Sequence, residues 1–397
     1  MTPARHDPVA ITGLGCICAA GRDLPSSVAS MFDVLPQPKP PVRFTSDHPT
    51  AYPVFEVGDV EETEDGLRTS ALGVHAAREA LADAGLDRDA LRGLTVGVCV
   101  GTTVGCVLSE ERFCRECQSG SDPDTTRLLR RLQMNPADTI ARAFGLTGPR
   151  QAIVNACSSG TDAIGVAGSW IRAGVCDAVI AGGADELGRI AYIGFISLMI
   201  TDDEPCKPFD VNRKGLNLGE GAAMLVLESE AVRRRRGRQA RSFLLGYGSA
   251  ADAYHPTTPR PDGAGLTRAI IEALACSGDR AQDVAFVNAH GTGTPDNDRV
   301  EARVLAQVLP GIPYLSTKGQ TGHTLGAEGA IEAALTSAFL NLGKVPASAG
   351  FVTPDPAIPN LPVQGVIPVS GPLALSQSLA FGGCNSVVSI GKGEGAR

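Results

Sequence analysis

The sequence predicts an α/β protein built from two similar halves. Short apolar segments alternate with segments of helical spacing along most of the 397 residues, the pattern of sheets covered by helices. Residues 94–103, LTVGVCVGTT, are typical of a parallel strand buried on both faces. The same order of elements starts again after residue 235, so we expect an internal duplication with halves 1–235 and 236–397.

The first half begins with a strand over residues 8–21 that enters a glycine-rich turn. Residues 36–66 are rich in proline and acidic groups and predict an irregular excursion. A helix over 72–86 is expected to end at Gly85. The later segments predict strands at 94–103, 151–157, 176–186 and 221–229, and helices at 135–149 and 161–174.

The second half repeats this alternation after the basic stretch 228–242, for which we expect a solvated helix end and connector rather than a docking patch. Its strands are expected at 240–252, 284–294 and 312–317, with a strand pair and tight turn at 378–391. Its helices are expected at 265–278, 296–309 and 328–343.

Composition narrows the function classes. A net charge of −8 gives no basic excess for nucleic acid. No apolar run approaches the ~20 residues of a membrane span, and the N-terminus lacks a secretory pattern. Eleven scattered cysteines without an export signal predict reduced thiols and a cytoplasmic protein. The lone CxxC at 114–117 has no second ligand pair, so we expect no metal site there.

Four glycine-, serine- or threonine-rich turns place a reactive or polar residue just after an apolar strand. They hold Cys157 in NACSSG, His290 in NAHGTGT, Lys318 and His323 in STKGQTGHTLGA, and Phe381 in AFGGCN. Ligand sites in α/β sheets lie at the carboxyl ends of strands. These side chains are therefore expected to converge if the turns share one side of the molecule.

The residues alone leave Cys157 open as a buried structural cysteine or as a nucleophile, and its context suits a nucleophile. A helix is expected to follow it, and a helix N-terminus stabilises a thiolate and lowers the thiol pKa. Backbone N–H groups of such a turn can stabilise an oxyanion. A thiol and two imidazoles, His290 and His323, suit acyl transfer. Zinc binding is disfavoured because Cys157 lies more than a hundred positions from the two histidines and no two of the three form a short ligand pair.

With these turns in place, the sequence resembles the elongating β-ketoacyl-[acyl-carrier-protein] synthases over nearly its whole length. The resemblance rests on NACSSG, CKPFDVNRKGLNLGEGAAMLVLE, NAHGTGTPDNDRVE, STKGQTGHTLGAEGAIEA and FGGCNSVV, in family order. It implies the thiolase fold, a duplicated five-layered α-β-α-β-α architecture. It also implies decarboxylative Claisen condensation, without a metal or other cofactor, on substrates carried by the phosphopantetheine arm of an acyl carrier protein.

The resemblance also implies roles for individual residues. Cys157 takes the acyl chain, and the N–H groups of Cys157 and Phe381 form the oxyanion hole. His290 and His323 hold the malonyl thioester, supported by Lys318 paired with Glu301. The positions expected to contact the phosphopantetheine arm or substrate are Thr292, Thr294, Leu216, Phe381 and Gly382.

Two relatives with other activities fit less well. Thiolases use a second cysteine near the C-terminus as a base, and Cys384 could correspond to it. The TKGQTGH segment, however, is not a thiolase feature. Non-condensing chain-length subunits lack the nucleophile that Cys157 supplies. Departures from the family pattern are Ala380 for glycine and Leu216 for a larger pocket residue, together with CSSG for the commoner CATG. Ala380 and Leu216 are expected to alter the shape or gating of the acyl pocket. Together with GGADELGRIAYIGFISLMI and EPCKPFDVNRKGLNLGEGA, the CSSG segment resembles synthases of specialised pathways, such as aryl polyenes, with housekeeping fatty acid elongation as the alternative.

The expected partners follow from the same resemblance. The acidic carrier protein requires a local basic patch on this acidic chain. Arg127, Arg130 and Arg131 are the predicted docking residues, with a solvated helix face as the other interpretation. The chain is expected to form a homodimer through the sheet edge of its first half, or a heterodimer with a second ketosynthase-like subunit.

Overall fold

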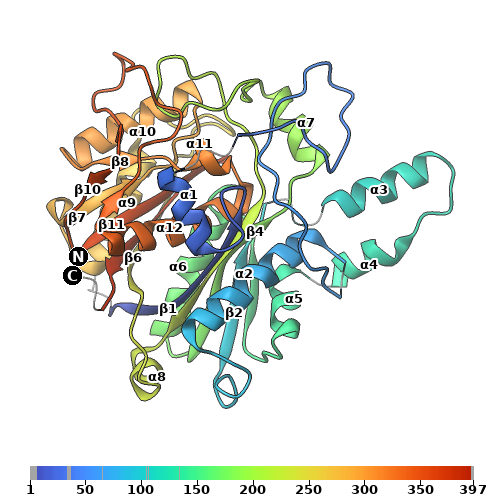
Figure 1. Cartoon of the computed structure of the whole chain (residues 1–397), viewed down its shortest axis with the longest axis horizontal. Helices are drawn as coiled ribbons and strands as arrows, with labels where there is room; N and C mark the ends of the chain where they lie inside the picture. Colours follow the sequence, from blue (N-terminus) through green and yellow to red (C-terminus); the bar gives the residue numbers. More distant parts are fainter. Residues whose placement is uncertain are drawn as a thin grey trace.

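In the computed structural model, two half-sheets share one strand order, and helices lie around them (Figure 1). The structure describes residues 7–33, 37–64, 66–103, 105, 107–133 and 135–394. The first half-sheet runs in the order β3 (Arg150–Ile153), β2 (Val96–Gly101), β4 (Ala178–Asp185), β5 (Gly221–Glu228), β1 (Val9–Cys18). Read from its edge, the second runs β8 (Tyr314–Leu315), β7 (Val284–Asn288), β11 (Leu373–Ala380), β12 (Cys384–Lys392), β6 (Ser242–Ala251).

The strand directions repeat as well as the order. β2 is parallel to β3 and β4, and β7 is parallel to β8 and β11. The other pairs within each half are antiparallel. The two halves join through β1 and β6, where Val9 pairs with Leu244 and Ile11 with Ser242. The chain is therefore a duplicated α/β structure whose half-sheets meet in one continuous hydrogen-bonded ladder.

Helices form three layers around the half-sheets. α6 (Ser159–Arg172) and α12 (Glu328–Leu342) contact strands of both halves and lie between them. α2 (Arg68–Ala84) and α5 (Pro136–Ala143) cover the outer face of the first half. α9 (Ala264–Ser277) packs on β6 and β12 and contacts α10 (Pro295–Val308) on the outside of the second. This is the five-layered arrangement that the resemblance predicted.

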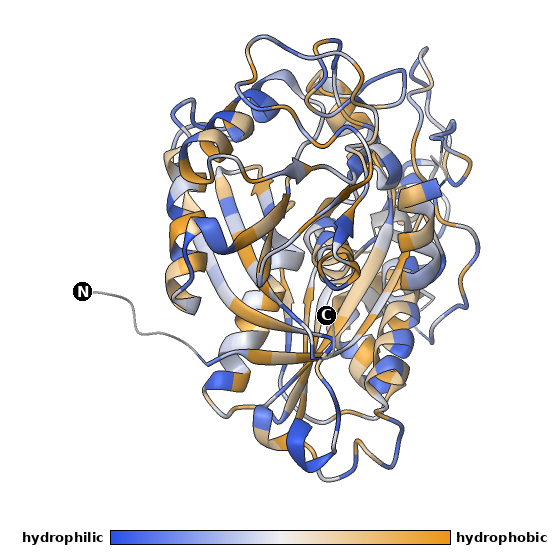
Figure 2. Ribbon diagram, turned by 60° about the vertical axis from the view of Figure 1, so that its left-hand side comes forward, coloured by the Kyte–Doolittle hydropathy of each residue, from blue (hydrophilic) through white to orange (hydrophobic). Residues whose placement is uncertain are grey.

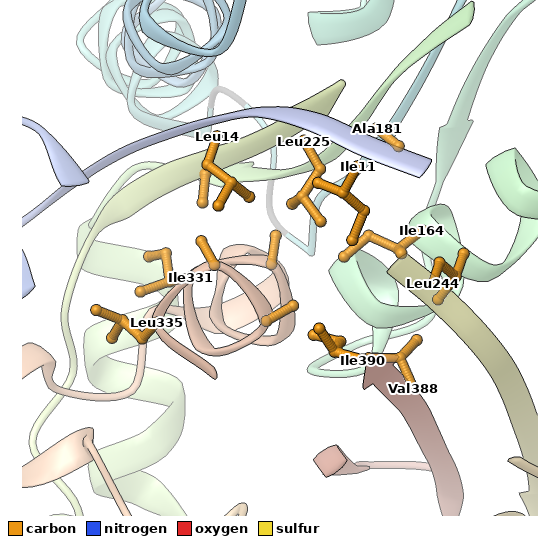
Figure 3. Close-up of a cluster of buried hydrophobic side chains, with 14 of the residues drawn as sticks. Ile11, Leu14, Ile164, Ala181, Leu225, Leu244, Ile331, Leu335, Val388 and Ile390 are labelled. Carbon is orange, nitrogen blue, oxygen red and sulfur yellow. The ribbon is translucent and has the colours of Figure 1, made fainter. Parts of the chain in front are cut away.

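The main hydrophobic core surrounds the two middle-layer helices, α6 and α12. Figure 3 shows Ile331 and Leu335 of α12 among residues of β1, β5, β6 and β12. Ile164 of α6 joins the same cluster from the other middle-layer helix. Figure 2 shows hydrophobic residues concentrated on the strands and on the helix sides that face them. Strands buried on both faces explain why the sequence showed continuous apolar runs there.

The remaining elements lie outside these layers. α1 (Leu24–Asp33) packs on β1 and α12, and α7 (Arg189–Ser197) precedes β5. α3 (Val107–Gln118) and α4 (Thr125–Gln133) form a helical hairpin that projects from the body (Figure 1). The short helices are α8 (Glu230–Arg235) and α11 (Lys318–Thr321), and a small ladder joins β9 (Lys344–Val345) to β10 (Ile367–Pro368). No helix in the described ranges is both long and apolar enough to cross a bilayer.

The basic stretch between the halves is partly structural. Arg233 is buried and pairs with Glu230 and Glu394 at 2.8 and 2.7 Å. Arg236 pairs with buried Glu228 at 2.5 Å and donates to the carbonyl of Ala84. The expectation of a wholly solvated helix end was therefore wrong for these two arginines, because each neutralises a carboxylate where the halves join.

Candidate active site

Cys157 lies at the turn between β3 and α6, as the sequence predicted. Ala156, just before it, has a φ of 48°, a left-handed conformation that costs free energy for a residue other than glycine. At Gly101 an added Cβ would lie 2.2 Å from the backbone of Ser159, so glycine lets the start of α6 approach β2. The thiol is 4% exposed and opens into the cavity described below.

Asp162, which the sequence analysis did not single out, holds this turn in place. Its carboxylate accepts hydrogen bonds from Asn155, Ser158 and Tyr247 at 2.6, 2.9 and 2.7 Å. Tyr247 comes from β6 in the second half, so the nucleophile turn is anchored across the duplication. An acidic residue in the first turn of a buried helix was the only sequence signal for this role.

The environment of the Cys157 thiol differs from the expectation. Burial raises its pKa, and the negative charge of Glu328 raises it further. The backbone N–H groups of Phe381 and Cys157 and the charge of Lys318 act in the opposite direction without reversing the shift. The predicted thiolate is therefore wrong for the free enzyme, because burial outweighs the helix N-terminus. The two N–H groups beside Sγ are nevertheless the pair expected for an oxyanion hole.

His290 and His323 face each other in the second half. His290 follows β7, and His323 follows α11 after β8. Their ring centroids are 5.7 Å apart at 83°, and both rings are almost fully buried. Burial lowers the pKa of His323 to about 4 and holds the pKa of His290 well below its usual range. Both imidazoles are therefore neutral at physiological pH.

Lys318 is buried behind the two histidines. Its Nζ donates to the carbonyl of His290 at 2.7 Å and to Glu332 Oε1 at 2.5 Å. The same atom lies 3.3 Å from Nδ1 of His290 and 3.4 Å from Glu328 Oε2. Burial acts to lower the Lys318 pKa, but Glu328 and Glu332 outweigh it and raise it. Lys318 is thus a fixed ammonium donor.

The expected pairing of Lys318 with Glu301 was wrong. Glu301 instead accepts the backbone N–H of His290 at 2.6 Å and that of Gly291 at 2.7 Å. Gln377 of β11 donates to it at 2.6 Å. Burial raises the pKa of Glu301 to about 7. Glu301 therefore positions the turn that carries His290, whereas Glu332 is the ion-pair partner of Lys318.

Two further carboxylates were missed. Glu328 and Glu332 lie four residues apart on α12, so they share one helix face toward the histidines. Glu328 Oε1 is 2.9 Å from Nδ1 of His290, and its Oε2 is 3.2 Å from Nε2 of His323. The signal in the sequence was two acids at the start of an otherwise apolar helix, where burial leaves them no solvent.

A cavity of about 360 Å³ collects the predicted residues. Cys157, His290, His323, Thr292, Thr294, Leu216 and Phe381 all line it. The Thr292 and Thr294 hydroxyls are 2.8 Å apart. Phe381 stacks on Phe195 of α7 with centroids 5.5 Å apart.

The expectation that Gly382 contacts substrate was wrong. Gly382 is exposed and does not line the cavity, because the turn places its backbone N–H on the carbonyl of Pro256. Gly383 lines the cavity in its place.

The remaining predicted residues do not line this cavity, or their side chains are not among those that the structure describes. Cys384 is 3.2 Å from Asn155 Oδ1 and does not line the cavity, which removes the thiolase-like interpretation of its thiol. Arg127, Arg130 and Arg131 lie on α4, and their side chains are outside the described residues.

Within the described residues, one group has the atoms of a metal site: Cys157, His323 and Glu328, whose ligand-type atoms lie within 4.8 Å of one another. The ammonium of Lys318 already faces Glu328 at 3.4 Å. A second cation beside it would be repelled, so this arrangement fits acyl-transfer chemistry better than metal binding.

Comparison with known proteins decides the family. The model of the β-ketoacyl synthase N-terminal domain matches residues 6–232, and that of the C-terminal domain matches residues 241–352. The chain belongs to the β-ketoacyl synthase family. It is therefore an acyltransferase that forms carbon–carbon bonds by condensation.

Individual β-ketoacyl synthases are similar over their full length. The 3-oxoacyl-[acyl-carrier-protein] synthase 2 of Synechocystis is 33% identical, covering 97% of this chain and 98% of the relative. The tetracenomycin polyketide synthase ketoacyl synthase alpha subunit of Streptomyces glaucescens is 32% identical, covering 99% of each. The solved ishigamide ketosynthase/chain length factor has a TM-score of 0.91 at 29% identity, covering 98% of this chain and 100% of that one.

Proposed function

We propose that Cys157 carries the growing acyl chain as a thioester and that His290 and His323 direct decarboxylation of a malonyl thioester. The observation that carries this proposal is the convergence of the three side chains, from both halves, on one cavity. The predicted halves 1–235 and 236–397 then divide the work: the first supplies the nucleophile and the second supplies the histidines.

In the first step, the Cys157 sulfur attacks the acyl carbonyl carbon, and the carrier thiol leaves. Charge develops on the carbonyl oxygen, and the N–H groups of Cys157 and Phe381 are placed to stabilise it. In the second step, the malonyl thioester loses carbon dioxide. Neutral His290 and His323 donate hydrogen bonds to the enolate oxygen that forms. The enolate carbon attacks the acyl-Cys157 thioester and the bond from the acyl carbon to the Cys157 sulfur breaks, which releases the β-ketoacyl thioester. The Cys157 sulfur takes one proton from solvent, the proton that decarboxylative condensation of a malonate carboxylate consumes.

Lys318 supports the second step through the histidine pair. Its ammonium lies 3.3 Å from Nδ1 of His290 and has no lone pair, so it can only donate there. Glu328 Oε1 is closer to Nδ1, at 2.9 Å, but makes no hydrogen bond with it, so the proton of neutral His290 is on Nε2, directed away from Lys318. Glu301 holds the backbone N–H of His290, and Glu332 holds the ammonium of Lys318, so both carboxylates maintain this arrangement.

We propose an acyl carrier protein as the donor of both substrates, with α4 as the docking helix through Arg127, Arg130 and Arg131. Its place on the projecting hairpin makes α4 accessible to a partner (Figure 1). No metal or redox cofactor is required, because loss of carbon dioxide drives the condensation. The proposed pathway is a specialised polyene or polyketide synthesis, with fatty acid elongation as the second candidate.

We propose a dimer through β3. This strand is the edge of the first half-sheet, and Val154 next to it is 69% exposed. An exposed edge beside an apolar side chain favours strand addition by a second chain. The similarity to a ketosynthase/chain length factor supports a heterodimer, and a homodimer is the alternative.

The test is a condensation assay with an acyl thioester, malonyl carrier protein and purified enzyme. The wild type should release β-ketoacyl carrier protein and carbon dioxide in equal amounts. Cys157→Ala should release no β-ketoacyl product, and undiminished product would overturn the assignment.

A further inference from the structure

Glu328 is a buried carboxylate that the proposed condensation does not yet use. It is the first residue of α12 and is 1% exposed. Among the described residues, neither of its oxygens has a hydrogen-bond partner, although three nitrogens of His290, Lys318 and His323 surround it. Buried acceptors are almost always hydrogen-bonded, so two open oxygens beside a reactive thiol require an explanation.

Cys157 needs a proton acceptor. Burial and the charge of Glu328 keep the thiol protonated in the free enzyme. Acyl transfer requires the thiolate, because the thiol itself is a poor nucleophile. A group near Sγ must therefore take the proton as the sulfur attacks.

Neither imidazole is set to accept this proton. Nδ1 of His323 accepts the N–H of Leu325 at 3.1 Å, so the ring proton is on Nε2. Nδ1 of His290 faces the Lys318 ammonium at 3.3 Å. Glu328 Oε1 lies nearer to Nδ1, at 2.9 Å, but makes no hydrogen bond with it, so Nδ1 is assigned as the acceptor from Lys318 and the ring proton is on Nε2. Both rings thus present N–H donors to the cavity, as the enolate requires, and offer no lone pair there.

Glu328 offers the lone pairs that the histidines lack. Sγ of Cys157, a ring nitrogen of His323 and a carboxylate oxygen of Glu328 lie within 4.8 Å of one another. This separation is spanned by one water molecule or by a small closing movement when substrate binds. Glu332, one turn later on α12, is instead held by Lys318 at 2.5 Å.

We propose that Glu328 accepts the Cys157 proton during acyl transfer and returns it to the departing carrier thiol. The S–H bond breaks as the Cys157 sulfur bonds to the acyl carbon, and the proton passes to a Glu328 oxygen. When the bond from the acyl carbon to the carrier sulfur breaks, that sulfur takes the proton from Glu328. The carboxylate is thereby regenerated, with no net proton exchanged. This step rests on the proposed role of Cys157.

The test compares single-turnover acylation of Cys157 by an acyl-pantetheine thioester, followed by intact mass. Glu328→Gln keeps the side-chain size and removes the basic oxygen, and we expect acylation at pH 7 to slow by about 10²-fold or more. An equal or faster rate would overturn the proposal, since it would show that Glu328 only raises the thiol pKa by its charge.

Formate rescue separates proton transfer from a structural role. In Glu328→Ala, sodium formate fits the space left by the carboxylate and should restore acylation at least several-fold. In the matched variant Glu332→Ala, formate can restore only the ion pair with Lys318, which supports decarboxylation, so the rate of acylation should not respond to formate. Rescue of both variants alike, or of neither, would contradict the proposal. A wild type that is not acylated would instead refute the role of Cys157.

Discussion

The backbone N–H of Leu325 donates a hydrogen bond to Nδ1 of His323 at 3.1 Å. This bond fixes the neutral tautomer of His323, with its proton on Nε2 and directed into the cavity with Cys157. His323 is therefore a hydrogen-bond donor in the resting enzyme. Its expected task is to stabilise the enolate rather than to activate the thiol.

This assignment separates the two half-reactions in the variant His323→Ala. Self-acylation of Cys157 should persist, because the sulfur and the two oxyanion N–H groups are untouched. Malonyl decarboxylation should fall by about 10²-fold or more, since one donor to the enolate oxygen is lost. Acylation by mass and carbon dioxide release measure the two steps separately. Equal loss of both activities would contradict the assignment.

The same residue predicts a pH dependence of stability. The pKa of His323 is about 4 in the folded chain against 6.5 for the free side chain, so the unfolded state binds more protons between these values. The free energy of unfolding should fall as pH decreases through this window, by about 2 kcal/mol between pH 7 and pH 5 from His323. Urea unfolding of wild type and His323→Gln measures it. A variant that retains the full pH dependence would argue against a buried neutral His323.

Leu216 predicts control of acyl chain length. It is 3% exposed and lines the cavity with Cys157. Leu216→Phe should fill part of the cavity and reduce acylation by the longest accepted chains by about tenfold, whereas short chains should be spared. Leu216→Ala should shift the preference toward longer chains. Competition among acyl thioesters of graded length reads out both, and an unchanged preference would place the acyl chain elsewhere.

Docking of the carrier protein can be tested by charge reversal on α4. Changing Arg127, Arg130 and Arg131 to glutamate should raise KM for the carrier substrate by about tenfold through like-charge repulsion. Hydrolysis of small thioesters should be unaffected. Arg235→Glu on α8 is the matched control, because it reverses an exposed arginine of the other basic stretch. Carrier kinetics unchanged by the α4 reversals would remove α4 from the interface.

The sequence predicted the fold and the site to different depths. Buried strands such as β2 and β4 appear as continuous apolar runs, and their alternation with helices is local, so the α/β class and the repeat were predictable. The position of Cys157, His290 and His323 at strand-end turns was predictable because each follows an apolar strand and lies among small residues. Their convergence on one cavity confirms that expectation.

Charge pairing was not predictable in the same way. Glu301 and Glu332 are both buried acids on helices near Lys318. Only the tertiary packing of α12 determines that Glu332, and not Glu301, forms the ion pair with Lys318. The prediction of a lowered Cys157 pKa was wrong for the same reason. The helix N-terminus is a local feature of the sequence, whereas burial and the charge of Glu328, which raise the pKa, come from the assembled fold.

The most direct test of the account is to incubate the protein with saturated and polyunsaturated acyl carrier protein thioesters and weigh the intact protein. We predict a mass increase of one acyl group that disappears in Cys157→Ala, and the preferred chain separates fatty acid from polyene substrates. Acylation that survives in Cys157→Ala, or no acylation from any carrier, would contradict the central role of Cys157.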